Sequence, residues 1–327
     1  MEKIDFKDIS FIVQGPIYDN YTPKVCESIR MFAPEAEIVI STWRNSNLRD
    51  LDYDILVESD DPGNFVFVLP EIMDNGSDLY QMNVNRQIVS TIQGLKNATR
   101  KYACKLRSDL IITGTNFINY FLKYNLPIME PYNSLLSHRV VTLTSVNPKR
   151  YNPFAYYLCD WFFFGLRDDL INIWDIPLVE PKLFRGQKMH GHYQMVENFG
   201  NEQYIWMGFL SKIQKINIQN GYQITDDILR DSEKSYANCC IFATAKNANV
   251  YSLKVKNTGY GDRTSLSNAG LYTENDWIRM YNKYCDGKIR AGRDIIEHME
   301  FHVAKNIRAL KKTKMKNIYS WLKKFRS

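Results

Sequence analysis

The chain has 327 residues, of which 45% are apolar and 24% are charged. This composition suits a globular protein with a sizeable core and excludes disordered, collagen-like and coiled-coil chains. The net charge is +6, but nine basic residues between Lys305 and Arg326 leave a mildly acidic body, which disfavours nucleic acid as a partner.

The first hundred residues alternate between strand-like and helix-like segments. Strands are predicted at residues 9–13, 37–43, 53–57 and 102–106, and helices at 22–32 and at about 83–100. The first helix begins at Thr22-Pro23, which supplies an N-cap and a proline at the first helical position. Strands separated by helices in this order predict an α/β fold with a mainly parallel, helix-covered central sheet.

Ligands bind such sheets at the carboxyl ends of the strands. Residues that fall there, or at the start of the following helix, are candidate nucleotide contacts: Gln14, Gly15, Thr42, Trp43, Asp61 and Arg86. Arg86 is equally well explained as a solvated arginine at a helix terminus. No glycine-rich phosphate loop follows the first strand, so the pattern disfavours a Rossmann dehydrogenase and a P-loop NTPase.

The segment from Lys105 to Asp109 is the most informative motif, because it places two cations and a carboxylate at the end of a buried strand. Burying charge is costly unless the charge is paired or meets a ligand. A diphosphate accounts for the motif if Lys105 and Arg107 neutralise phosphate oxygens and Asp109 binds a bridging Mg²⁺ or Mn²⁺. An internal ion pair of Asp109 with either cation accounts for it equally well.

The second half of the chain has a different character. Residues 151–165 are rich in aromatic side chains, which predicts a deep core strand with an aromatic wall beside a pocket. A helix is predicted from Asn201 through Leu210. His190 and His192 point the same way in a predicted strand. We interpret them as acceptor contacts or surface residues rather than as a pair of metal ligands.

Short motifs occur in a consistent order over roughly residues 9–285. They are Ile9-Ser10-Phe11-Ile12-Val13-Gln14-Gly15-Pro16, Ile40-Ser41-Thr42-Trp43, Asp61-Pro62-Gly63, Asn85-Arg86-Gln87-Ile88, Gly94-Leu95-Lys96, the segment from Tyr102 to Asp109, Asp160-Trp161-Phe162-Phe163-Phe164-Gly165 and Glu202-Gln203-Tyr204. Together they resemble the WavE-type lipopolysaccharide-biosynthesis family. The resemblance implies a glycosyltransferase of surface-polysaccharide assembly, with a GT-A-like nucleotide-sugar-binding domain over residues 1–285.

The implied GT-A pattern places an Asp-x-Asp motif after the fourth strand. Here that position holds Arg107-Ser108-Asp109, so either Asp109 alone binds a divalent metal or Lys105 and Arg107 replace the metal electrostatically; we favour the metal. The resemblance also places the base that deprotonates the acceptor in the later region, at Glu202 or Asp160. Without that role, Glu202 is a first-turn helix residue and Asp160 is a buried carboxylate satisfied by backbone amides.

Residues 286–327 form a predicted basic helical tail. Five apolar or aromatic residues recur there at three- and four-residue intervals: Met315, Ile318, Tyr319, Leu322 and Phe325. Lysines cover the remaining faces, and a basic amphipathic helix of this kind suits an anionic membrane surface. A helix docked on the body and a disordered tail are the two alternatives.

The six cysteines form no CxxC pair, and the first residues contain no apolar signal segment, which predicts buried free thiols and a cytoplasmic protein. We therefore expect a glycosyltransferase that is peripheral on the inner face of the plasma membrane. It would use a nucleotide-sugar donor and a lipid-linked oligosaccharide acceptor of lipopolysaccharide core, O-antigen or capsule. The alternatives are a transferase of another nucleotide-activated group, such as a phosphoryl-linked polyol, and a non-catalytic membrane-surface module.

Overall fold

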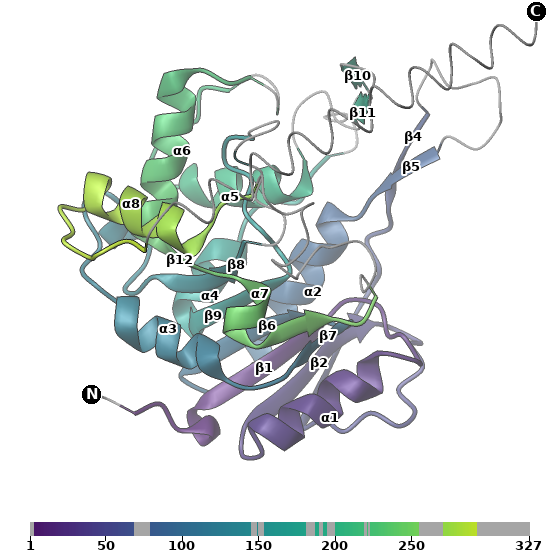
Figure 1. Ribbon diagram of the computed structural model, residues 1–327. Coiled ribbons are helices and arrows are strands. Elements are labelled where there is room, and N and C mark those ends of the chain that lie inside the picture. Colours follow the sequence, from purple (N-terminus) through teal and green to yellow (C-terminus); the bar gives the residue numbers. More distant parts are fainter. Residues whose placement is uncertain are drawn as a thin grey trace, which may run out of the picture.

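The computed structural model describes residues 3–68, 79–144, 149, 154–180, 187–189, 192–194, 200–218, 221, 223–254 and 271–292. In this part of the chain, a central sheet of seven strands carries helices on both faces (Figure 1). Its strands are β1 (Ile9–Gln14), β2 (Glu37–Trp43), β3 (Ile55–Ser59), β6 (Tyr102–Arg107), β8 (Val140–Leu143), β9 (Phe162–Leu166) and β12 (Cys240–Ala243).

The sheet has the strand order β12-β8-β9-β6-β1-β2-β3. The pairs β1–β2, β1–β6, β2–β3 and β8–β12 are parallel. The predicted α/β fold with a mainly parallel sheet is therefore confirmed. One strand differs, because β9 runs antiparallel to both of its neighbours, β6 and β8.

The helices are α1 (Thr22–Phe32), α2 (Val84–Asn97), α3 (Asn116–Tyr124), α4 (Arg167–Trp174), α5 (Asn201–Leu210), α6 (Asp226–Cys239), α7 (Ala245–Ala248) and α8 (Glu274–Tyr284), with short 3₁₀ helices η1 (Phe6–Asp8) and η2 (Tyr132–Ser134). Helices α2 and α4 contact each other and cover one face of the sheet, whereas α3 covers β8, β9 and β12 on the other. Helix α1 spans the predicted residues, but the predicted cap is wrong: Tyr21 is the N-cap, without a side-chain capping bond, and Thr22 and Pro23 are the first two helical residues.

Three small two-stranded sheets accompany the central one. They are β4 (Phe65–Val68) with β5 (Leu79–Met82), β7 (Leu110–Ile112) with β13 (Val250–Ser252), and β10 (Gln187–Met189) with β11 (His192–Gln194). The pairing of β7 with β13 matters most for function, because it joins residues about 140 positions apart in the sequence next to the end of β6. The sequence patterns did not predict the β4–β5 hairpin or β13.

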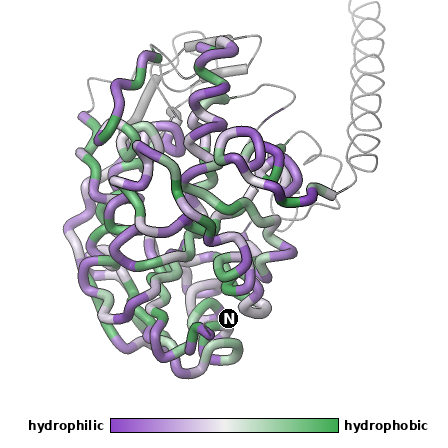
Figure 2. The backbone as a smooth tube through the Cα atoms, turned by 90° about the vertical axis from the view of Figure 1, so that its left-hand side faces the viewer, coloured by the Kyte–Doolittle hydropathy of each residue, from purple (hydrophilic) through white to green (hydrophobic). Residues whose placement is uncertain are grey.

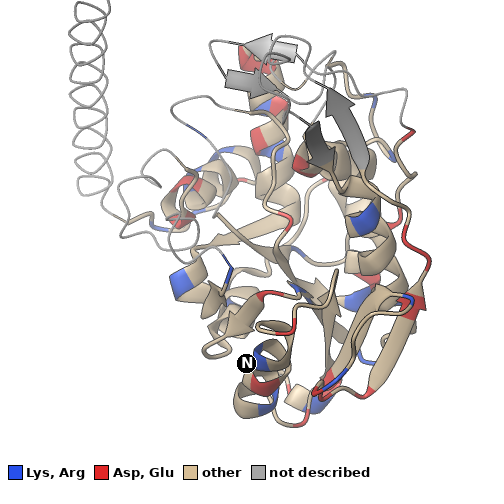
Figure 3. Ribbon diagram, turned by 90° about the vertical axis from the view of Figure 1, so that its right-hand side faces the viewer, with Lys and Arg blue, Asp and Glu red and all other residues tan. Residues whose placement is uncertain are grey.

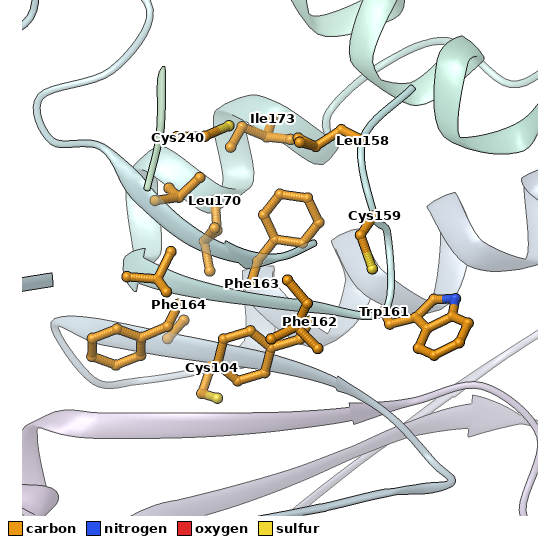
Figure 4. Packing of buried hydrophobic residues seen from close by; sticks show 14 of the residues in the cluster. Cys104, Leu158, Cys159, Trp161, Phe162, Phe163, Phe164, Leu170, Ile173 and Cys240 are labelled. Carbon is orange, nitrogen blue, oxygen red and sulfur yellow. The ribbon is translucent and has the colours of Figure 1, made fainter. Parts of the chain in front are cut away.

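The core follows from the alternation of side chains along β9. Phe162 and Phe164 pack against Phe117 of α3, with ring centroids 5.3 and 4.9 Å away, while Phe163 meets Trp174 of α4 at 5.8 Å. Figure 4 shows Phe163 on the side of Leu170 and Ile173, with Phe162 and Phe164 on the opposite side. The predicted core strand in the aromatic segment is thus confirmed.

Other predictions about the chain have mixed outcomes. The six cysteines are buried and free, as predicted. Hydrophilic and hydrophobic residues alternate along much of the backbone (Figure 2), as expected of elements that bury one side and expose the other. In the described part of the chain, no helix is long and apolar enough to cross a membrane. Most of the predicted basic tail, from residue 293 on, lies outside the described residues.

Candidate active site

A cavity of about 500 Å³ opens at the carboxyl ends of β1, β2 and β6. It is lined by Gln14, Gly15, Pro16, Tyr18, Trp43, Asn64, Asn83, Arg86, Gln87, Ser90, Arg107, Ser108, Asp109 and Lys254. Five of these residues, namely Gln14, Gly15, Trp43, Arg107 and Asp109, come from the strand ends that the sequence indicates. The aromatic side chains in the lining are Tyr18 and Trp43, and none comes from the described part of the aromatic segment before β9.

The floor of the cavity is held by two loops that hydrogen-bond to each other. The backbone N–H of Ser108 donates to the carbonyl of Gln14 at 3.1 Å, and the Ser108 hydroxyl donates to the carbonyl of Pro16 at 2.6 Å. Gly15 lies between them with a φ of +113°, which favours glycine because other residues are strained there. The ends of β1 and β6 are therefore fixed relative to each other before any ligand binds.

Arg107 and Asp109 form an ion pair at the cavity wall. The guanidinium Nε donates to Asp109 Oδ1 at 2.8 Å and Nη2 donates to Oδ2 at 2.7 Å, while the Ser252 hydroxyl donates to Oδ2 at 2.9 Å. The Arg107 guanidinium also lies 4.3 Å from the centre of the Trp161 ring. Although burial opposes the shift, Arg107 holds the pKa of Asp109 below its usual value.

Lys254 is a cavity residue that no local sequence pattern indicates. It follows β13, and its ammonium donates to the Tyr18 hydroxyl at 3.1 Å and lies 4.8 Å from the centre of that ring. The backbone N–H of Leu253 donates to the carbonyl of Asp109 at 2.9 Å, which holds Lys254 near the Arg107–Asp109 pair. A further cation, Arg86, lines the cavity and pairs with Asp61.

The lining therefore carries three cations, Arg86, Arg107 and Lys254, against the carboxylate of Asp109. Figure 3 shows basic and acidic residues interspersed over the described elements on its side of the molecule, so this concentration of positive charge is local. Two of these cations are paired with carboxylates, Arg86 with Asp61 and Arg107 with Asp109, so the excess is one positive charge, and a positive cleft attracts anionic ligands. The cavity is thus suited to an anionic group such as a diphosphate.

Lys105 lies away from the cavity, in the core between the sheet and α4. Its side chain is 0% exposed, donates to the carbonyl of Asp160, and has its ammonium 4.7 Å from the centre of the Trp174 ring. Burial lowers the pKa of Lys105 to about 8, while the Asp160 charge opposes that shift. Of the two predicted phosphate-binding cations, the structure brings only Arg107 to the cavity.

The two candidate bases lie together behind Arg107. Asp160 is 3% exposed, and Glu202 is half-buried in the first turn of α5, where it hydrogen-bonds to Tyr157. Burial and then the Asp160 charge raise the pKa of Glu202 to about 8, whereas the Arg107 charge acts in the opposite direction. Neither carboxylate is among the described residues that line the cavity.

The remaining predicted contacts divide between the cavity and its surroundings. Gln14 lines the cavity and accepts a hydrogen bond from the Ser90 hydroxyl at 2.6 Å. Thr42 is buried beside Ser46 and does not line the cavity. Asp61 does not line the cavity but pairs with Arg86, which does. The hydrogen bonds from Arg86 hold the pKa of Asp61 below its usual value. The side chains of the His190–His192 pair lie outside the described residues.

The residues present do not fit a divalent metal at Asp109. Both carboxylate oxygens already accept hydrogen bonds, and the guanidinium occupies the carboxylate edge that a metal would share. Among the residues that the structure describes, no group of three His, Cys, Asp or Glu side chains could hold a metal ion. The expected metal site at Asp109 is therefore not supported by the geometry.

Comparison with solved structures finds crystal structures of S. aureus TarS. The structure of TarS 1-349 is 13% identical, with a TM-score of 0.36, and the match covers 85% of this chain and 70% of that chain. The structure of TarS is 11% identical, with a TM-score of 0.35 and 85% and 43% coverage. TarS 1-349 in complex with UDP-GlcNAc is 11% identical, with a TM-score of 0.32 and 85% and 71% coverage.

Comparison with sequences identifies the family. No curated protein matches the chain. A family model described as WavE lipopolysaccharide synthesis, however, matches residues 9–315, which is most of the chain and includes every residue of the cavity. The family indicated by the sequence motifs is confirmed, and the chain belongs to the WavE lipopolysaccharide synthesis family.

Proposed function

We propose that this protein is a GT-A-like glycosyltransferase that moves a sugar from a nucleotide-sugar donor to a lipid-linked surface-polysaccharide acceptor. The observation that carries the proposal is the cavity at the carboxyl edge of the sheet, where Arg86, Arg107 and Lys254 converge. Membership of a lipopolysaccharide synthesis family supports a role in making a surface polysaccharide. A diphosphate-linked donor matches both the charge and the position of the cavity.

In this proposal the donor lies along the strand ends. Its diphosphate meets Arg107 and Lys254, and its nucleoside lies toward Trp43 and Gln14, which supply an aromatic face and a buried amide. The loops on either side of Gly15 are already hydrogen-bonded to each other. Binding therefore costs little reorganisation of the protein, which favours affinity.

The transfer step would use a carboxylate on the other side of Arg107. In a transfer with inversion, Glu202 or Asp160 accepts the proton of the acceptor hydroxyl. The oxygen of that hydroxyl attacks the anomeric carbon of the donor sugar as the bond between this carbon and the diphosphate breaks. The nucleoside diphosphate leaves with its added charge facing Arg107 and Lys254. Glu202 is the better candidate, because it is half-buried whereas Asp160 is 3% exposed. The ionised form of Glu202 that accepts a proton predominates above its pKa of about 8.

The membrane part of the proposal rests on the sequence. Residues 286–327 contain the basic amphipathic segment, and a lipid-linked acceptor would bring such an enzyme to an anionic bilayer surface. We propose the inner face of the plasma membrane as its location. The division into a catalytic domain at 1–285 and a tail at 286–327 is part of the same proposal.

A thermal-shift screen of UDP-, GDP-, CMP- and dTDP-sugars tests the function. A ligand at about 100 times its Kd stabilises a protein by about 2.7 kcal/mol, which raises the Tm by several degrees. We expect one nucleotide class to do so, and expect the shift to fall to about half or less in Lys254→Met but to persist in full in Lys246→Met. Lys246 is exposed and does not line the cavity.

The product of the reaction separates the alternatives. Release of a nucleoside diphosphate from a diphosphate donor supports sugar transfer, and release of a monophosphate from such a donor indicates transfer of a phosphoryl-linked group. If no nucleotide sugar changes the Tm and none is consumed, the chain is not a nucleotide-sugar enzyme and the non-catalytic reading replaces the proposal.

A further inference from the structure

We infer that the donor diphosphate is held by Arg107 and Lys254 without a bridging divalent metal, and that Asp109 serves to orient Arg107. This inference rests on the proposed nucleotide-sugar donor and specifies how it is bound. It assigns Lys254 as a donor-binding residue and makes Asp109 a positioning residue. Four observations about the cavity carry it.

The first observation is the bonding of Asp109. Its side chain is 3% exposed, and its two oxygens accept bonds from Arg107 Nε and Nη2 at 2.8 and 2.7 Å, with Ser252 adding a third at 2.9 Å. A metal at either oxygen would lie beside the guanidinium, and the two positive charges would repel each other. The carboxylate therefore acts as a partner for arginine.

The second observation concerns further ligands. Mg²⁺ in phosphate sites is usually held by one or two carboxylates together with substrate phosphates and water. Within the described lining of the cavity, Asp109 is the only acidic side chain. Because that carboxylate is paired with Arg107, the described lining has no free carboxylate for a metal.

The third observation is the arrangement of Arg107. Asp109 engages Nε and Nη2, so Nη1 takes part in neither of these bonds. The Arg107 side chain is 23% exposed, and the guanidinium rests 4.3 Å from the centre of the Trp161 ring. A planar guanidinium fixed on one edge by a carboxylate and on one face by an aromatic ring is ready to bind phosphate oxygens.

The fourth observation is the approach of Lys254 from a distant part of the sequence. The ladder between β7 and β13 pairs Ser252 with Leu110, and the Lys254 charge is close enough to help lower the pKa of Asp109. The ammonium is positioned over Tyr18. Lys254 and Arg107 together present two cationic groups to a diphosphate, and Asp109 balances one of the two charges.

Isothermal titration of UDP, GDP, CDP and dTDP tests this inference, with one series in EDTA and one in Mn²⁺. We expect at least one nucleoside diphosphate to bind with a Kd that changes by less than about threefold between the two series. Lys254→Met should weaken that binding about tenfold or more in both series, because it removes a charge-assisted contact. Lys246→Met is the matched control and should bind as the natural protein does.

Asp109→Asn separates the two roles of the carboxylate. If Asp109 orients Arg107, the variant should weaken binding by the same factor in EDTA and in Mn²⁺; Asp168→Asn, on an exposed side chain, is the control. If Asp109 binds metal, the effect of the variant should vanish in EDTA. The titration of the unmodified protein decides the question even if Asp109→Asn fails to fold.

The outcomes distinguish this inference from the proposed function. Binding that requires Mn²⁺ overturns the metal-free inference and leaves the nucleotide-sugar donor in place. Absence of binding by every nucleoside diphosphate, in both series, overturns the proposed function and the inference with it.

Discussion

Lys105 and Arg107 lie two residues apart on the same strand, yet the structure puts them to different uses. Lys105 is fully buried against Trp174 and donates to the carbonyl of Asp160. Arg107 is at the end of the strand, lines the cavity and pairs with Asp109. The two cations belong to two regions. One is a buried cluster of Lys105, Trp174 and Asp160 under α4, and the other is the open cavity at the sheet edge.

The comparison shows that distance from the strand end decides what a cation on β6 can do. The buried cluster also supports the cavity, because Lys105 holds the Asp160 carbonyl and the next residue, Trp161, lies against the Arg107 guanidinium. A buried cation thus positions the segment on which the accessible cation rests. The predictions that follow test whether the two regions can be separated.

The largest effect is expected from Glu202→Gln, which tests whether the carboxylates behind Arg107 take part in the chemistry. Loss of a general base lowers the rate about 10²- to 10⁴-fold, so transfer should fall by that factor while the Kd for donor stays within about twofold. Rate and donor affinity measured on the same preparation check this. A transfer rate unchanged by the substitution would remove Glu202 from the catalytic step.

The next effect concerns stability and should belong to the buried cluster alone. Lys105→Ala leaves a cavity under α4, and losing a large buried side chain typically costs about 2–5 kcal/mol. Lys96 is exposed and pairs with Asp175 at the surface. Lys96→Ala should lower the free energy of unfolding by less than about 1 kcal/mol. Urea unfolding of both variants measures the difference; equal values would show that Lys105 is not a core residue.

A smaller effect should belong to the cavity. Arg107→Met removes charge-assisted bonds and should weaken nucleoside diphosphate binding about 10- to 100-fold. Lys105→Met keeps the length of the side chain but loses the bond to the Asp160 carbonyl. It should weaken this affinity less than Arg107→Met, because Lys105 does not line the cavity and acts on it only through the neighbouring Trp161. Similar losses in the two variants would mean that the regions act as one.

The smallest predicted effect is a pH dependence of stability. Burial raises the pKa of Glu202 from 4.5 to about 8, so the folded protein binds an additional proton between these values and the free energy of unfolding should fall as pH rises. Burial lowers the pKa of Lys105 from 10.5 to about 8. Between about pH 8 and pH 10.5 the unfolded chain therefore binds the additional proton, and the contribution of Lys105 to the free energy of unfolding should rise with pH.

Glu202→Gln isolates the first of these contributions. Its free energy of unfolding should decline less between about pH 5 and pH 8 than that of the natural protein. Unfolding measured at several pH values provides the curve. Parallel curves for the two proteins would show that Glu202 keeps an ordinary pKa.

Much of the fold could be predicted because its signals are local. Continuous apolar runs identify β1, β2 and β6, and their order implies a parallel sheet whose ends meet. That reasoning also brings Gln14, Trp43 and Arg107 to one edge. The direction of β9 could not be predicted in this way, because an antiparallel strand with both faces buried has the same apolar pattern as a parallel one.

The rest of the site depends on contacts between distant segments. Lys254 reaches the cavity only because β13 pairs with β7, and nothing in the residues around it indicates that pairing. Alternation along β6 places Lys105 and Arg107 on one face, but the burial of Lys105 depends on Trp174 of α4. The bidentate pairing of Arg107 with Asp109 likewise requires the turn between β6 and β7.

Acylation of lysines, read by mass spectrometry with and without a saturating nucleotide sugar, tests the central claim most directly. The account predicts that the donor protects Lys254 from modification and leaves Lys246, exposed and outside the cavity lining, equally reactive in both samples. A bound donor that leaves Lys254 as reactive as before would place the nucleotide sugar elsewhere and contradict the assignment of this cavity.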